Sequence, residues 1–167
     1  PEATHAREPE THSELRKWNT VREAILEDTP DLKTDLARGE TQVGIDGHPD
    51  DPAHRVRRHH DSTVEMIAAI RKHGDSWPDL RGTTDEDKIK DCHKDINDTS
   101  AGAAYGIMDP DKPAPTLTTR CTNISSGRFT HPTENRAITF REAAMLMTFP
   151  RWFELPELNS HAERVVG

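Results

Sequence analysis

"NRAITFREAAMLMTFP", residues 135–150, is the stretch that decides how the last part of the chain folds. Thr139 and Glu142 are spaced as a capping box, in which each side chain satisfies a backbone amide that the first helical turn leaves unpaired. Pro150 closes the segment, because proline cannot continue a helix. The apolar face between these signals consists of Ala143, Ala144, Leu146 and Met147. The pattern predicts a short helix with a defined start and a defined end.

The segment before this helix is polar and rich in threonine: "PAPTLTTRCTNISSGRFTHPTE", residues 113–134. We interpret it as a β-leaning run followed by a Gly-Arg loop. Hydroxyls and backbone amides position phosphates, arginine forks read guanine edges, and Gly127 would let a backbone approach a ligand closely. The side chains with this chemistry are Thr116, Thr118, Thr119, Arg120, Ser125, Ser126 and Arg128. An ordinary solvated hairpin has the same composition, so both interpretations stay open.

The composition limits the size of the core and the kind of partner. A length of 167 residues suits one domain or slightly more, and 32% hydrophobic against 31% charged residues predicts a lean core. The formal net charge is −8, which argues against holding nucleic acid by charge alone. Local basic patches can still bind it.

Two further capping boxes predict helix starts in the first half of the chain, Thr20 with Glu23 and Ser62 with Glu65. The second helix should end at Gly74, a natural C-cap. Its expected apolar face consists of Val64, Ile67, Ala68 and Ile70. The aromatic and aliphatic residues expected to be buried anchors outside the helices are Trp77, Leu80, Trp152, Phe153 and Leu155.

The remaining segments are expected to be irregular. Residues 1–19 read as a polar connector and residues 31–61 as an exposed loop. Helices and short strands mix without a βαβ rhythm, which predicts an α+β fold. The chain begins at Pro1 and ends at Gly167 just after an apolar pair, so we expect it to be a piece of a longer protein.

The cysteines and the hydropathy indicate the compartment. Cys92 and Cys121 do not make a disulfide framework, and a reduced intracellular pair is expected. No apolar run approaches the ~20 residues that span a bilayer. The sequence therefore predicts a cytoplasmic protein with no membrane partner.

Histidines in "HRVRRHH", residues 54–60, raise the question of a metal. Their spacing is unlike that of zinc ligands, so we predict no metal site. With its arginines this stretch is instead the most basic patch of the chain and a modest candidate for touching a phosphate backbone. The sequence also lacks G-x-S-x-G, G-x-x-x-x-G-K-[ST] and G-x-G-x-x-G. No complete active site can be assembled from these residues.

Residues 135–150 resemble the ninth conserved motif of the DNA (cytosine-5) methyltransferases, which runs approximately R-x-L-T-x-R-E-x-A-R-L-Q-x-F-P. The matching positions are Arg136, Thr139, Arg141, Glu142, Ala144, Leu146, Phe149 and Pro150. Residues 105–136 are similar to the stretch that precedes this motif in the family. The resemblance is strong in the last third of the chain and looser before it.

The resemblance implies a division of the chain. Residues 1–19 would be the connector after the eighth motif, residues 20–134 the target recognition domain, and residues 135–167 the ninth-motif helix with the return toward the catalytic domain. In the family a Rossmann-like catalytic domain binds S-adenosylmethionine, and a cysteine thiolate attacks the flipped cytosine. The capped helix would brace the DNA-reading loop from behind.

Residue roles carry over only where the motif matches. The DNA contacts implied by chemistry and resemblance together are Thr116, Leu117, Thr118, Arg120, Ser126, Gly127 and Arg128. Arg136, Thr139, Arg141 and Glu142 are expected to be structural ties. Met145 and Met147 stand where the family has arginine and glutamine, and we expect them to pack.

In the family the Pro-Cys, Glu-Asn-Val and cofactor-binding glycine motifs lie upstream of this region, and none of them is in this chain. The resemblance also implies that the tenth motif would begin at Gly167, the last residue of this chain. We therefore expect the full-length protein to use S-adenosylmethionine on duplex DNA in restriction-modification, and this chain alone to bind no cofactor and be inactive. Its catalytic domain would lie in the same or a separate chain. A non-catalytic DNA-binding module, a subunit of a split enzyme and an RNA-directed family member remain alternatives.

Overall fold

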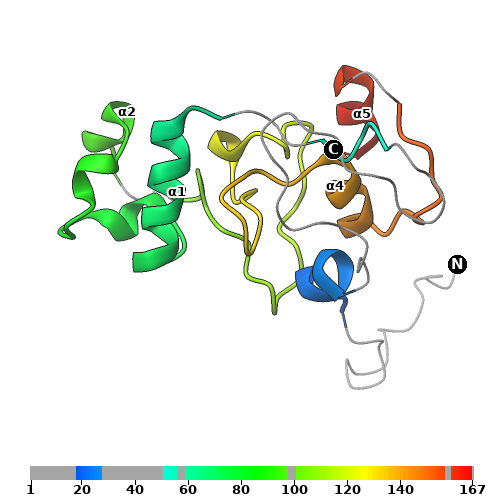
Figure 1. The fold of residues 1–167 in the computed structure, drawn as a ribbon, viewed down its shortest axis with the longest axis horizontal. Coiled ribbons are helices and arrows are strands. Elements are labelled where there is room, and N and C mark those ends of the chain that lie inside the picture. The colour runs from blue at the N-terminus through cyan, green and yellow to red at the C-terminus, as the bar shows by residue number, and fades with distance from the viewer. Residues whose placement is uncertain (1–17, 28–50, 56–58, 98–100, 157–158, 167) are drawn as a thin grey trace, which may run out of the picture.

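The computed structural model describes residues 18–27, 51–55, 59–97, 101–156 and 159–166. The helices in these ranges are η1 (Glu23–Glu27), α1 (Asp61–His73), η2 (Trp77–Leu80), η3 (Glu86–Lys88), α2 (Asp91–Lys94), η4 (Ile124–Ser126), α4 (Phe140–Leu146) and α5 (Asn159–Val166). The arrangement is elongated, with α1 and α2 at one end, α4 and α5 at the other, and irregular chain between them (Figure 1). Nothing among the described helices is long and apolar enough to cross a bilayer.

Two main apolar clusters occupy the two ends. The α4 cluster comprises Val21, Ile25, Ala53, Met108, Cys121, Phe129, Ile138, Phe140, Ala143, Ala144, Met145, Leu155, Ala162 and Val166. The α1 cluster comprises Met66, Ala69, Ile70, Trp77, Leu80, Ile89, Ala104 and Ile107. A small third cluster of Ile67, Ile124 and Ala137 lies between them. Phe129 and Ile138 share the α4 cluster, so apolar packing crosses the proposed boundary at residue 134.

The helix start predicted at Thr20 is confirmed. The Thr20 amide donates to the Glu23 carboxylate at 2.7 Å, and the Glu23 amide donates to the Thr20 hydroxyl at 3.2 Å. The helix is a short π-helical turn, and its side chains Val21 and Ile25 are buried. The Val21 amide also donates to the Lys112 carbonyl at 2.9 Å, which fixes this turn against the start of the threonine-rich run.

The second predicted capping box is wrong. Helix α1 starts two residues earlier, with His60 as N-cap in place of Ser62, so Ser62 lies inside the first turn and its hydroxyl accepts from Lys90 Nζ at 3.0 Å. The buried face differs from the predicted one and consists of Thr63, Met66, Ile67, Ala69 and Ile70, while Ala68 is exposed. The predicted end is confirmed, because Gly74 caps the helix and its amide donates to the Ile70 carbonyl at 2.7 Å.

The short strands expected in the second half are replaced, among the described residues, by isolated bridges. Ile107 pairs with Thr130 in parallel and Thr130 pairs with Ala137 in antiparallel orientation. The threonine-rich run itself forms no strand between Pro113 and Thr118. Prolines in this run lack the amide that a strand ladder needs.

The predicted anchors divide into buried and exposed residues. Trp77 and Leu80 are fully buried and Leu155 is 7% exposed, which confirms these three. Trp152 is 69% exposed, so its assignment as a buried anchor is wrong. Met147, expected on the apolar face of α4, is 46% exposed because it is the C-cap, beyond the last helical residue. Met145 packs in the α4 cluster as predicted.

Candidate nucleic-acid interface and its supporting network

The start of α4 is fixed by the capping box that the sequence predicts. The Thr139 amide donates to Glu142 Oε2 at 2.8 Å, and the Glu142 amide donates to the Thr139 hydroxyl at 3.1 Å. Both side chains are almost completely buried, at 1% exposure each. A buried carboxylate needs a cation and several donors to remain charged.

Arg136 supplies that cation. Its Nη1 donates to Glu142 Oε2 at 2.9 Å and its Nη2 to Glu142 Oε1 at 2.8 Å, a two-pronged pairing. Glu134 contacts the same guanidinium, accepting from Nε at 2.8 Å. Burial would raise the pKa of Glu142, but the Arg136 guanidinium holds it well below its ordinary range. Burial likewise opposes the charge of Arg136, but the two carboxylates raise its pKa.

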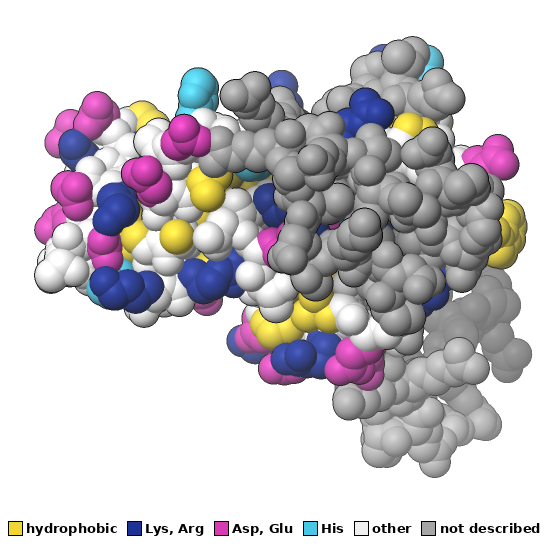
Figure 2. Space-filling view, viewed as in Figure 1, with side chains coloured by type: hydrophobic (Ala, Val, Ile, Leu, Met, Phe, Trp, Pro, Cys, Tyr) yellow, Lys and Arg dark blue, Asp and Glu magenta, His cyan; other side chains and the backbone are white. Residues whose placement is uncertain are grey.

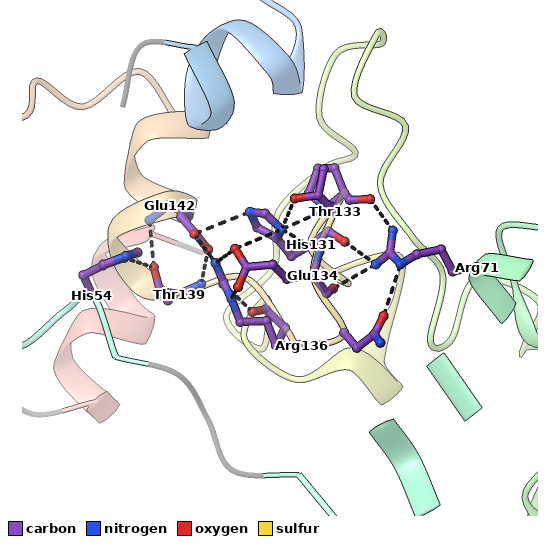
Figure 3. A network of polar contacts seen from close by, with 11 residues as sticks. His54, Arg71, His131, Thr133, Glu134, Arg136, Thr139 and Glu142 are labelled. Atoms are coloured by element: carbon purple, nitrogen blue, oxygen red, sulfur yellow. Dashed lines mark hydrogen bonds and ion pairs between the residues drawn. The ribbon is translucent and has the colours of Figure 1, made fainter. Parts of the chain in front are cut away.

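Two neutral histidines lie beside this ion pair (Figure 3). His131 is 2% exposed, and its Nδ1 accepts from the amides of Glu134 at 3.1 Å and Thr133 at 3.3 Å. Because Nδ1 accepts, the ring proton sits on Nε2, which faces Glu142 Oε1 at 3.7 Å. Burial lowers the pKa of His131 to about 4, so this imidazole is uncharged at neutral pH.

His54 corrects the interpretation of "HRVRRHH" as a basic surface segment. It is 1% exposed, its Nδ1 lies 2.9 Å from the Thr139 hydroxyl, and burial lowers its pKa. Arg55 and His60 are exposed, while residues 56–58 lie outside the described residues. His54 thus supports the start of α4, while phosphate contact by the arginines of this stretch stays a prediction.

Arg141 makes a second buried ion pair, with Asp51. Each side chain is 4% exposed, and Arg141 Nη1 also donates to the Phe153 carbonyl at 2.9 Å. Asp51 in turn accepts from the Ala53 amide at 3.0 Å. Residues 51–54 were expected to be an exposed loop, and this is wrong because Asp51 and His54 have partners on α4 and its cap. The rest of that expected loop up to residue 50 lies outside the described residues.

Arg71, on the last turn of α1, hydrogen-bonds to the loop of residues 131–135. Its Nε donates to Asn135 Oδ1 at 3.1 Å, and its Nη2 donates to the carbonyls of His131 at 3.1 Å and Glu134 at 2.8 Å. A further bond runs from Nη1 to the Pro132 carbonyl. Sequence analysis missed this role, since a basic residue at a helix end is sufficiently explained by the helix dipole.

The predicted DNA contacts lie on the irregular chain between the two ends of the structure. Four of them are exposed side chains: Thr116, Thr118, Arg120 and Ser126. Leu117 is half-buried against the α4 cluster, and Gly127 is half-buried near the buried ring of Phe129. The exposed hydroxyls and the Arg120 guanidinium are thus available to a ligand.

Arg128 is more restrained than the sequence suggests. Its side chain is 32% exposed, and Nη1 pairs with the Asp75 carboxylate at 2.9 Å and donates to the Ile107 carbonyl at 3.1 Å. Asp75 follows Gly74, the C-cap of α1. Positive and negative side chains alternate over the α1 and α2 end of the visible face, with no large basic patch there (Figure 2). Specific contacts, not a broad field, would have to hold a nucleic acid.

The glycines of this region are not an open cradle for a cofactor. A Cβ built on Gly127 would lie 2.7 Å from a Phe129 ring carbon, and one on Gly106 would lie 2.9 Å from the Ala103 carbonyl oxygen. The protein's own atoms fill the space over both glycines, so these residues do not fit a role in holding S-adenosylmethionine. Across the described ranges, no group of three or more His, Cys, Asp or Glu side chains could hold a metal ion.

Neither cysteine is arranged as a nucleophile with a base and an oxyanion site. Cys92 is exposed on α2, with its Sγ 3.0 Å from His93 Nδ1, and Cys121 is buried in a turn of the α4 cluster, not on the strand expected. The two form no disulfide. The buried carboxylates are committed to arginines. Among the described residues, the arrangement fixes loops in position.

The fold and site define a module that presents an exposed polar loop on a base of buried ion pairs. The chain belongs to the C-5 cytosine-specific DNA methylase family, whose model matches residues 7–167.

Three relatives illustrate the match. Type II methylase M.HgiDII of Herpetosiphon aurantiacus is 36% identical over 146 residues, which are 87% of this chain and 36% of that protein. Type II methyltransferase M1.BsuMI of Bacillus subtilis (strain 168) is 40% identical over 69 residues, 41% of this chain and 16% of that protein. Type II methyltransferase M.AquIB of Picosynechococcus sp. (strain ATCC 27264 / PCC 7002 / PR-6) is 33% identical over 113 residues, 66% of both chains. The chain thus spans about a third of M.HgiDII.

Proposed function

We propose that this chain is the DNA-recognition portion of a DNA (cytosine-5) methyltransferase of a restriction-modification system, which transfers a methyl group from S-adenosylmethionine to C5 of cytosine in duplex DNA. Residues 20–134 form the target recognition domain of an α+β fold, and residues 135–167 brace it and lead back toward a Rossmann-like catalytic domain. That domain lies in the same or a separate chain.

One observation carries the recognition role: the exposed hydroxyl and arginine segment runs directly into the buried network at the start of α4. Thr116, Thr118, Arg120 and Ser126 are exposed, while Arg136, only eight residues beyond Arg128, is 5% exposed and paired with Glu142. A ligand-reading loop gains precision when rigid elements hold it. The residues that contact DNA and those that support them are therefore distinct sets.

The chemistry of methyl transfer would come from outside this chain. The sequence has no cysteine in a Pro-Cys context. Neighbouring atoms of the protein occupy the space where a Cβ would lie on Gly106 and Gly127. In this proposal these residues therefore take no part in methyl transfer from S-adenosylmethionine, and this chain alone should be inactive.

A second candidate, the subunit of a split enzyme, is favoured by the size of one relative. The 113 matched residues are 66% of M.AquIB, so that methyltransferase is about 170 residues long. A methyltransferase of this length supports the proposal that the two halves can lie on separate chains. The catalytic partner would then be a separate polypeptide that binds this one.

Two measurements test these proposals. Binding of the purified chain to a pool of random-sequence DNA duplexes, in competition with tRNA, tests the recognition role and its preference for DNA. Preference for tRNA would support the RNA-directed alternative instead. Transfer of radiolabelled methyl groups from S-adenosylmethionine to DNA, with and without an added family catalytic domain, tests the division of labour. Transfer by this chain alone would refute the predicted inactivity.

A further inference from the structure

Arg71 and Asp75 hold two ends of one segment from the same end of α1. Arg71 contacts the loop at residues 131–135 through four acceptors, and Asp75 pairs with Arg128 at 2.9 Å. Arg71 lies on the last turn of α1, and Asp75 lies two residues beyond the last helical residue, His73. Segment 128–135 is therefore held at its first residue by Asp75 and at residues 131–135 by Arg71 of α1.

The contacts of Arg71 differ in kind from an ordinary surface ion pair. Three of its four acceptors are backbone carbonyls, so the bonds fix the path of the chain and not only a side chain. A planar guanidinium with five donors suits this better than lysine would. The loop in turn connects to α4, because the Glu134 carboxylate binds Arg136, and Arg136 binds Glu142.

A continuous chain of polar contacts thus runs from α1 to the start of α4 (Figure 3). We propose that Arg71 is a positioning residue: it clamps residues 131–135 against α1 and thereby holds Arg128 in place on the DNA-reading face. This inference rests on the proposed DNA-recognition function. Arg71 itself touches no DNA in this scheme and acts through Arg128.

The first test compares hydrogen–deuterium exchange in the whole chain and two variants. R71Q removes the clamp. R81Q is the matched control, since Arg81 likewise donates to backbone carbonyls at the α1 end, those of His93 at 3.3 Å and Ile96 at 3.0 Å. Faster exchange of residues 131–135 in R71Q, but not in R81Q, is expected. Faster exchange throughout R71Q would reduce Arg71 to a general stabiliser and overturn the proposal.

The second test measures affinity for a random-sequence duplex pool in a double-mutant cycle of R71Q and R128A. Each single variant should weaken binding by about fivefold to a hundredfold, the range for loss of one arginine contact to a base. The double variant should bind about as weakly as R128A, since Arg71 acts through Arg128. A double variant whose loss of affinity equals the product of the two single fold-losses would overturn the proposal. An R71Q affinity equal to that of the unmodified chain would overturn it as well.

The two tests separate the clamp from the function on which it rests. Exchange needs no DNA, so a chain that binds no duplex would overturn the proposed recognition role while the exchange pattern still decided whether the clamp exists. An intact clamp without any effect on DNA affinity would overturn the positioning role alone.

Discussion

Removal of the Glu142 carboxylate should destabilise the protein far more than a surface mutation, because this almost completely buried group accepts from three donors. Glu142 is 1% exposed and accepts from Arg136 Nη1 and Nη2 and from the Thr139 amide, at 2.9, 2.8 and 2.8 Å. In Glu142→Ala, Arg136 remains buried with only the partly exposed Glu134 as a carboxylate partner.

The magnitude follows from these contacts. Breaking a buried ion pair by removing one partner costs about 3–5 kcal/mol, because it leaves a desolvated charge. Loss of the carboxylate side of the capping box adds roughly 1 kcal/mol, and the remaining Glu134 contact offsets part of the total. We therefore expect Glu142→Ala to lose about 3–5 kcal/mol, against the 5–15 kcal/mol that typically stabilise a domain. Glu142→Gln, which keeps an acceptor for the Thr139 amide, should lose less.

Equilibrium urea unfolding, followed by circular dichroism, gives these free energies by linear extrapolation. A cycle with Arg136→Met isolates the pairwise part, and the double variant Arg136→Met with Glu142→Gln should be more stable than the sum of the single losses predicts. If the two losses simply add, or if Glu142→Ala unfolds at the urea concentration of the unmodified chain, the pairing does not stabilise α4 and the reasoning fails.

Three further outcomes are expected. The pKa of His131 is lowered to about 4 in the folded state, so the free energy of unfolding should be highest above the unfolded pKa near 6.5 and fall by up to roughly 3 kcal/mol toward pH 4. In His131→Gln, urea unfolding should show a weaker dependence of this free energy on pH, and an unchanged dependence would contradict the assignment. Asp51→Asn should cost roughly 2–4 kcal/mol in the same assay, as for a broken buried pair, whereas Asp111→Asn, which removes an exposed pair, should change nothing measurable. Gly127→Ala should lower the melting temperature, since its Cβ would lie 2.7 Å from the buried Phe129 ring and overpacking costs about 1–3 kcal/mol; an unchanged melting temperature would show that the ring moves freely.

Local signals in the sequence predicted local structure well and distant pairing poorly. The capping boxes at Thr20 and Thr139 could be found because both members lie within one helical turn. The partner of Arg141 could not be found, since Asp51 lies 90 residues earlier in a stretch that has the composition of a loop. Only the fold brings such groups together, and no spacing rule describes it.

The failure at Ser62 has a different cause. Ser62 is a good N-cap residue and Glu65 stands at the capping-box spacing, so the pattern favours a start two residues later than the observed one, which has His60 as N-cap. The observed start has no side-chain cap bond, and the helix is instead held by packing, since Met66 and Ala69 share the α1 cluster with Trp77 and Leu80. The choice depends on residues beyond the helix, and a periodicity argument within the helix cannot make it.

The distribution of arginines explains how an acidic protein could still read DNA. Arg136 and Arg141 pair with carboxylates inside the protein, and Arg71 donates to carbonyl oxygens. These three guanidinium groups therefore fix the chain in position and are not free to bind a ligand. Arg120 is exposed, and Arg128 keeps part of its surface while Asp75 fixes its direction. With a net charge of −8, non-specific attraction to phosphates should be weak, because counterion release scales with the number of cations that reach the backbone. Under the proposed function, affinity would therefore come from a few well-held contacts, and the network behind the loop would contribute to recognition by holding them in place.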